Sequence, residues 1–88
     1  MVERSKGAAR KLSSNRGFVY YELTQYDKAL IDYNKSLELD PESAVTYKRR
    51  GQAYLGLGQT DKAKADFEKA LALNPNDEET KTLLKELA

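Results

Sequence analysis

The apolar and small residues of this chain recur at spacings of three and four, which is the pattern of one face of an α-helix. Four such stripes follow one another along the chain. They comprise Ser13, Gly17, Tyr20 and Leu23; Ala29, Leu30, Tyr33 and Leu37; Tyr47, Gly51, Tyr54 and Leu57; and Ala63, Phe67, Ala70 and Leu71. The pattern predicts four amphipathic helices, each of which buries its stripe.

The same pattern occurs twice, with a period of 34 residues. When residues 10–43 are aligned with residues 44–77, thirteen of the 34 positions are identical. The matched pairs include Arg16 with Arg50, Gly17 with Gly51, Asp32 with Asp66 and Pro41 with Pro75. A fixed period of this length indicates a repeat architecture, in which one unit cannot bury its apolar face alone and stacks on its neighbour.

Each unit is predicted to be a helix, a short turn and a second helix. Proline disfavours the helical conformation at the residue before it, so the second helices should end just before Pro41 and Pro75. Between the paired helices, residues 24–26 and 58–60 are too few for anything except the turn of an antiparallel helical hairpin.

The two ends of the chain differ from the repeated units. Residues 78–88 predict one amphipathic helix with Asp77 or Asn76 as its N-cap, and its polar outer side would cap the stack. Residues 1–9 match neither unit and are expected to fray or to extend the first helix. The predicted organisation is an extension at 1–9, repeats at 10–43 and 44–77, and a capping helix at 78–88.

This pattern resembles the tetratricopeptide repeat (TPR) family, whose unit is a 34-residue helix-turn-helix. The matching positions are Gly17, Tyr20, Ala29, Tyr33 and Pro41 in the first unit, and Tyr47, Gly51, Tyr54, Ala63, Phe67 and Pro75 in the second. The resemblance implies an all-α fold of five helices, in which antiparallel hairpins stack as a short right-handed solenoid.

Two kinds of residue carry packing expectations. Because Gly17 and Gly51 have no Cβ, we expect them to face Ala29 and Ala63 across the hairpins, so that the two backbones approach closely. Arginine, at position 16 and again at position 50, stands where the family pattern has leucine. We expect the alkyl stem of each arginine to cover the seam while its guanidinium reaches water.

The resemblance also implies a concave groove lined by the first helix of each unit. The positions beside the buried stripes are Lys11, Ser14, Asn15, Phe18 and Glu22 in the first unit, and Val45, Lys48, Arg49, Gln52 and Leu55 in the second. Residues 10–23 contain three basic residues and one acidic residue, and residues 44–57 contain three basic residues and no acidic one. The two first helices therefore carry a net charge of +5, which favours an acidic partner.

One TPR subclass grips the C-terminal carboxylate of heat-shock chaperones through lysine, asparagine and arginine on successive first helices. Asn15 and Arg49 resemble two members of that clamp, and an amide and a forked guanidinium both hydrogen-bond a carboxylate. Val45 stands where the clamp has lysine, and the 88 residues hold no counterpart of the clamp's preceding unit. A carboxylate clamp and a more general peptide groove are both compatible with the sequence.

Composition excludes several kinds of chemistry. The chain has no cysteine and no histidine, so it lacks disulfides, thiolate nucleophiles and the commonest metal ligand and general base. Its net charge of +1 gives little support to a nucleic-acid binder, and it has no apolar run long enough for a membrane span. No cofactor, metal site or catalytic site is expected, and the expected location is cytoplasmic.

The sequence thus predicts a non-enzymatic adaptor that binds an acidic peptide or partner segment in a basic concave groove. Its groove residues would be Lys11, Asn15, Phe18, Glu22, Lys48, Arg49, Gln52 and Leu55. The alternative is a structural or engineered repeat scaffold that self-associates as a homodimer and has no dedicated ligand, because two repeats are fewer than the three usually needed for stability.

Overall fold

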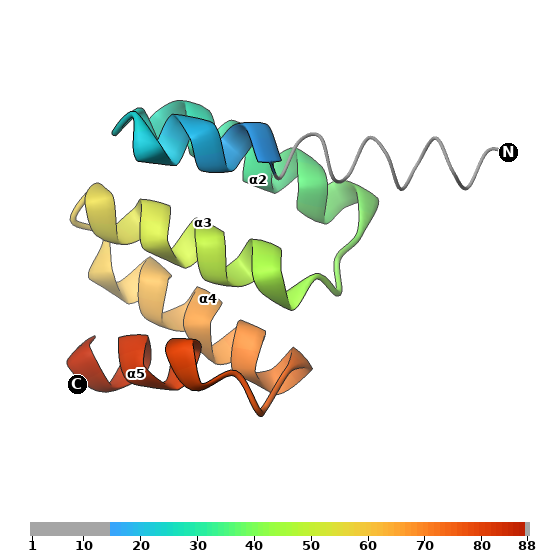
Figure 1. Cartoon of the computed structure of the whole chain (residues 1–88), viewed down its shortest axis with the longest axis vertical. Helices are drawn as coiled ribbons and strands as arrows, with labels where there is room; N and C mark the ends of the chain where they lie inside the picture. The colour runs from blue at the N-terminus through green and yellow to red at the C-terminus, as the bar shows by residue number, and fades with distance from the viewer. Residues whose placement is uncertain (1–14, 88) are drawn as a thin grey trace, which may run out of the picture.

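The computed structural model describes residues 15–87, and all regular structure in that range is helical (Figure 1). A first helical segment spans residues 15–22, and it is followed by α2 (Tyr26–Leu39), α3 (Ala44–Gly56), α4 (Thr60–Leu73) and α5 (Glu78–Leu87). The helices stack in chain order along the longest axis, with α2 against α3, α3 against α4 and α4 against α5. The predicted all-α helical-repeat fold is confirmed. The extension at 1–9 and the expectations for Arg10, Lys11, Ser13 and Ser14 lie outside the described residues.

The two hairpin turns each fall one residue earlier than predicted, at residues 23–25 and 57–59. In both turns a residue adopts the left-handed conformation that ends many helices, Thr24 with φ 59° and Gly58 with φ 76°. The backbone N–H of Gln25 then donates to the carbonyl of Tyr20 at 2.8 Å. These bonds satisfy carbonyl groups at the helix end, so the second helix can begin one residue sooner than the turn composition indicates.

Caps and prolines define the remaining helix ends, and of these the ends before the prolines and the cap of the last helix were predicted. Helices α2 and α4 end at Leu39 and Leu73, two residues before each proline. Ser43 caps α3, and its hydroxyl accepts a hydrogen bond from the Thr46 backbone N–H at 3.3 Å. The corresponding residue 34 positions later, Asp77, caps α5.

The stability of the first turn of α5 depends on pH, because Asp77 caps this helix through its carboxylate. Its carboxylate accepts hydrogen bonds from the Thr80 hydroxyl at 2.7 Å and from the backbone N–H groups of Thr80 and Glu79. The Thr80 hydroxyl bond is the largest cause that holds the pKa of Asp77 below its ordinary value of 3.8, and the backbone bonds and the Lys48 charge act in the same direction. Because the folded-state pKa is lowered, the capping contribution is complete above pH 3.8 and is lost as pH falls through the folded value.

We therefore expect the first turn of α5 to lose hydrogen-exchange protection as pH falls below about 4. Amide exchange at Thr80, followed by NMR and corrected for the intrinsic pH dependence, measures this. The control is Asp77→Asn, because asparagine caps a helix equally well but does not titrate. Equal acid-induced loss of protection in the two proteins would show that the Asp77 carboxyl is not the cause.

The side-chain atoms nearest to Gly17 and Gly51 across the hairpins belong to aromatic rings. A Cβ added at Gly51 would lie 2.6 Å from Cε1 of Phe67, and one added at Gly17 would lie 2.6 Å from Cε1 of Tyr33. These ring contacts were not predicted from the sequence, and the expected contacts with Ala29 and Ala63 stay a prediction. The rings, which are fully buried, lie across the glycines one turn further along the second helix.

Ala29 takes part in the contact between the two units. Ala29 is buried in one cluster with Tyr33 of its own helix and Ala53 of α3. Small side chains at these positions let α2 and α3 approach, so the repeats stack closely. Most predicted stripe residues are buried or half-buried, but Leu23 is 57% exposed and Leu57 is 36% exposed. Both were expected to be buried, and both lie in the turns, beyond the last helical residue.

The two first helices differ in how well they are covered. Helix α2 covers α3, where Ala53 is fully buried and the Arg50 side chain is 21% exposed. At the equivalent positions of the first helical segment, Val19 is 55% exposed and the Arg16 side chain is 60% exposed. Within residues 15–87, the first hairpin thus presents to solvent the face that the second hairpin buries.

No helix among those described has both the length and the apolar composition required to cross a bilayer.

Candidate functional site

The predicted groove residues come from two elements, the first helical segment and α3. The structure brings two of them together across the units, because the Arg49 guanidinium lies over the Phe18 ring, 5.0 Å from its centroid. A guanidinium over an aromatic face is a favourable cation–π arrangement. The Phe18 side chain is 40% exposed, so this pair is accessible at the surface.

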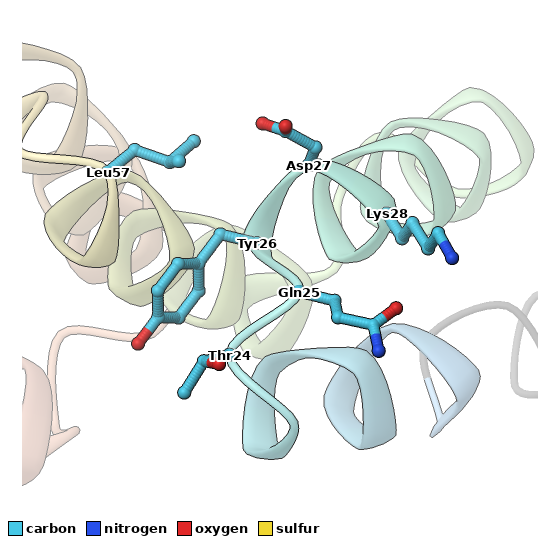
Figure 2. Close-up of a pocket in the computed structure, with 6 residues that line it drawn as sticks. All are labelled: Thr24, Gln25, Tyr26, Asp27, Lys28 and Leu57. Atoms are coloured by element: carbon cyan, nitrogen blue, oxygen red, sulfur yellow. The ribbon is translucent and has the colours of Figure 1, made fainter.

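Further aromatic rings continue from this pair toward the hairpin turn. Phe18 stacks on Tyr21 with ring centroids 6.4 Å apart, and Tyr21 meets Tyr26 at 5.6 Å. Figure 2 shows Tyr26 extending from the turn toward α3, where its ring fills the space beside Gly56. The first unit thus provides a partly exposed aromatic row that ends beside a cation.

Lys48 is directed toward α5. Its ammonium nitrogen lies 3.0 Å from a carboxylate oxygen of Glu79 and 3.7 Å from one of Asp77, and its side chain is 20% exposed. The lysine therefore connects the second unit with the capping helix. The prediction that it contacts an anionic ligand remains a prediction, and such a ligand would compete with these two carboxylates.

The other predicted groove residues vary in exposure. Asn15 and Glu22 are exposed, Gln52 and Leu55 are half-buried, and Val45 is 50% exposed. Lys11 lies outside the described residues. Asn15 precedes Phe18 by about one helical turn, which places an exposed amide on the same side of the helix as the Phe18–Arg49 pair.

The two repeated arginines form ion pairs inside their hairpins. The Nε and Nη2 atoms of Arg50 donate to the two carboxylate oxygens of Asp66 at 2.8 and 2.7 Å. Arg16 makes the same bidentate pair with Asp32 at 2.9 and 2.8 Å. Both aspartates are buried, and their hydrogen bonds raise the pKa of each arginine. The expectation that these guanidinium groups reach water did not include their carboxylate partners, and it describes Arg16, whose side chain is 60% exposed, better than Arg50, whose side chain is 21% exposed.

These pairs change the charge of the surface. Arg16, Arg50 and Lys48 all face carboxylates, so three of the cations counted toward the predicted net charge of +5 are offset by acidic groups from neighbouring helices. The sequence contains a signal that was missed. A charged residue, Asp32 and again Asp66, stands inside an otherwise buried stripe in both units, and this position predicts a buried ion pair.

An open pocket lies at the first hairpin turn, outside the predicted groove (Figure 2). Its lining residues are Thr24, Gln25, Tyr26, Asp27, Lys28 and Leu57. The Asp27 side chain points away from those of Gln25 and Lys28, which extend to the same side, so the three polar groups do not converge on one point. In the part of the chain that the structure describes, no three acidic, histidine or cysteine side chains are grouped to hold a metal ion.

Comparison with known proteins supports the repeat architecture. A "tetratricopeptide repeat" family model matches residues 44–77, and a "TPR repeat" model matches residues 17–58. No curated protein gives a significant match.

Several solved structures are similar to this chain. The first TPR of Spaghetti (RPAP3) bound to the HSP90 peptide SRMEEVD is 32% identical with a TM-score of 0.86, over 89% of this chain and 62% of that one. The Arabidopsis OM64 TPR domain is 33% identical with a TM-score of 0.87, over 92% of this chain and 67% of that one. The second TPR domain of human RPAP3 with the HSP70 peptide SGPTIEEVD is 33% identical with a TM-score of 0.86, over 92% of this chain and 68% of that one.

The chain spans 62% of the length of the first of these structures. Both units nevertheless have the same helical hairpin and the same glycine–aromatic contact, and the family models match residues in both. The chain therefore belongs to the tetratricopeptide repeat family, whose members are generally protein-interaction modules.

Proposed function

We propose that this chain is a non-enzymatic adaptor that binds an acidic peptide segment of a partner protein across its first helical segment and α3. The observation that carries the proposal is the Arg49 guanidinium lying over the exposed Phe18 ring, since it joins a cation and an apolar surface from two repeats. The peptides in the two similar RPAP3 structures both end in EEVD, which supplies carboxylates beside an apolar valine.

This surface offers a binding partner both for the carboxylates and for the apolar side chain of such a peptide. The Arg49 guanidinium would bind a carboxylate through paired hydrogen bonds, and the Asn15 amide would donate to a second acceptor. Phe18 and Leu55 would contact the apolar side chain. Lys11 and Gln52 would support these contacts, and Lys48 would join them by exchanging Glu79 for the ligand.

Arg49→Glu tests the proposal. With a labelled SRMEEVD peptide that has a free C-terminus, we expect the charge reversal to weaken binding at least tenfold, because hydrogen bonds to charged groups contribute about 1.5–3 kcal/mol. Fluorescence anisotropy measures the affinity. Lys64→Glu is the matched control, since it makes the same charge change at an exposed position of α4 outside the groove.

The remaining outcomes separate the alternatives. Binding by Arg49→Glu within twofold of the wild type would contradict the groove assignment. A C-terminally amidated peptide that no longer binds would identify a carboxylate clamp, whereas one that binds almost unchanged would identify a general acidic groove. A self-associating scaffold without a dedicated ligand would bind none of these peptides.

A further inference from the structure

The hydroxyl group of Tyr33 is buried and has no hydrogen-bond partner among the described residues, and the side chain as a whole is 0% exposed. Buried polar atoms are nearly always paired, because an unpaired one has lost its water without compensation. A buried hydroxyl in this state needs an explanation other than packing.

Packing does not require the hydroxyl, as the second repeat shows. Phe67 is the equivalent residue and is also 0% exposed. A Cβ at Gly51 would lie 2.6 and 2.8 Å from Cε1 and Cδ1 of Phe67, and a Cβ at Gly17 would lie at the same distances from the same atoms of Tyr33. The two rings therefore pack alike, and only the first carries a hydroxyl.

Packing places Tyr33 beside the candidate site, because Tyr21 packs against the buried cluster that contains Tyr33 and also stacks on Phe18, the ring under Arg49. The groups whose charges act on the phenol are Arg49, Tyr21, Asp32 and Glu22. Burial raises the pKa of Tyr33 to about 12, although the Arg49 charge lowers it, so the phenol is protonated at neutral pH and can donate a hydrogen bond. Glu22 is exposed and does not accept that bond.

Two long side chains lie at the surface near Tyr21. Arg49 is half-buried and lies over Phe18, which stacks on Tyr21 and is 40% exposed. Side chains of this kind change rotamer without moving the backbone, and such a change is the route by which a ligand carboxylate would reach the phenol.

We propose that the Tyr33 hydroxyl is a specificity-determining donor of this surface, which hydrogen-bonds a carboxylate of the acidic peptide held by Arg49. This inference rests on the proposed function. An O–H donor and a guanidinium acting on one carboxylate make charge-assisted bonds, which a neutral side chain in the peptide cannot replace. The hydroxyl would thus favour acidic peptides over neutral ones of the same shape.

The experiment compares wild type, Tyr33→Phe and the control Tyr54→Phe, which removes a half-buried phenol of α3 outside the predicted groove. The probe is labelled SRMEEVD with a free C-terminus. We expect Tyr33→Phe to bind about tenfold more weakly, with a melting temperature equal to or above that of the wild type, and Tyr54→Phe to bind as the wild type does.

Peptide analogues then locate the bond. In four analogues, each acidic side chain is replaced singly by its amide or the C-terminus is amidated. The effect of Tyr33→Phe should disappear for one of them. If Tyr33→Phe binds SRMEEVD like the wild type while Arg49→Glu does not, the inference is overturned and the proposed function stands. An equal loss with all four analogues also overturns it. Absence of binding by the wild type overturns the proposed function and this inference with it.

Discussion

Gly51→Leu should remove at least about 3 kcal/mol of folding free energy and lower the melting temperature by more than about 12 °C. The reason is the contact with Phe67, where even a Cβ would lie 2.6 Å from a fully buried ring. Because the ring is fully buried and lies between the two helices, the leucine is expected to force α3 and α4 apart. Thermal unfolding followed by circular dichroism measures the effect.

Gln52→Leu is the matched control, because it introduces the same side chain at the next residue, which is only half-buried. We expect its melting temperature to stay within a few degrees of that of the wild type. Gly51→Ala should fall between the two, since alanine adds the clashing Cβ but also favours the helix. A Gly51→Leu protein as stable as Gln52→Leu would contradict the importance of the glycine–ring contact.

Arg50→Met should cost about 3 kcal/mol of stability, at the lower end of the range for breaking a buried ion pair. Methionine keeps much of the apolar stem and the helix propensity of arginine, so the main loss is the partner of Asp66, whose side chain is 7% exposed. The substitution also removes the hydrogen bond of 2.9 Å from Arg50 to Asn34 of α2. Urea unfolding at neutral pH measures the change.

The first repeat supplies the control for this prediction. Arg16→Met breaks the same bidentate pair, but the Arg16 side chain is 60% exposed, so water can replace it at Asp32. We expect a clearly smaller loss of stability than for Arg50→Met. Equal losses in the two variants would show that burial does not decide the strength of this pair.

The helices and their ends could be predicted because they depend on local sequence. Apolar spacing, the prolines at positions 41 and 75 and the polar residue before α5 act within a few residues of the features they determine. Each turn begins one residue earlier than predicted and contains a left-handed residue, which is Thr24 in the first turn and Gly58 in the second. This conformation is uncommon for a residue other than glycine, so the first turn was the harder to predict.

The partners of individual side chains were harder to predict because they depend on how helices cross. Helical spacing places Gly51 on the inner face of α3, but it does not say that the Phe67 ring lies nearest to it. In the same way, Lys48 is on the predicted groove side, yet its length allows it to reach the carboxylate of Glu79 on α5. Net charge counted along one helix overlooks such pairs between elements.

The candidate site was predicted in outline from the repeat register. Register identified Phe18 and Arg49 as groove positions, and the structure brings them into contact. It did not identify Tyr33, because an aromatic residue in a buried stripe is explained by packing alone. Only a structure that shows the surroundings of the hydroxyl separates Tyr33 from Phe67.

Because the first helix of the first unit is less covered than the first helix of the second unit, the two ends of the helical stack differ in how well they could accept a further hairpin. A hairpin added in front of residues 15–22 would meet Arg16 and Val19 at the positions where α2 already holds Arg50 and Ala53, so its docking geometry has a template within the same chain. A helix added beyond α5 would meet Lys85 where the other first helices have glycine, and an aromatic ring cannot approach there. We therefore expect that an added hairpin can be engineered onto the side of residues 15–22, and that an addition beyond α5 would require redesign of α5.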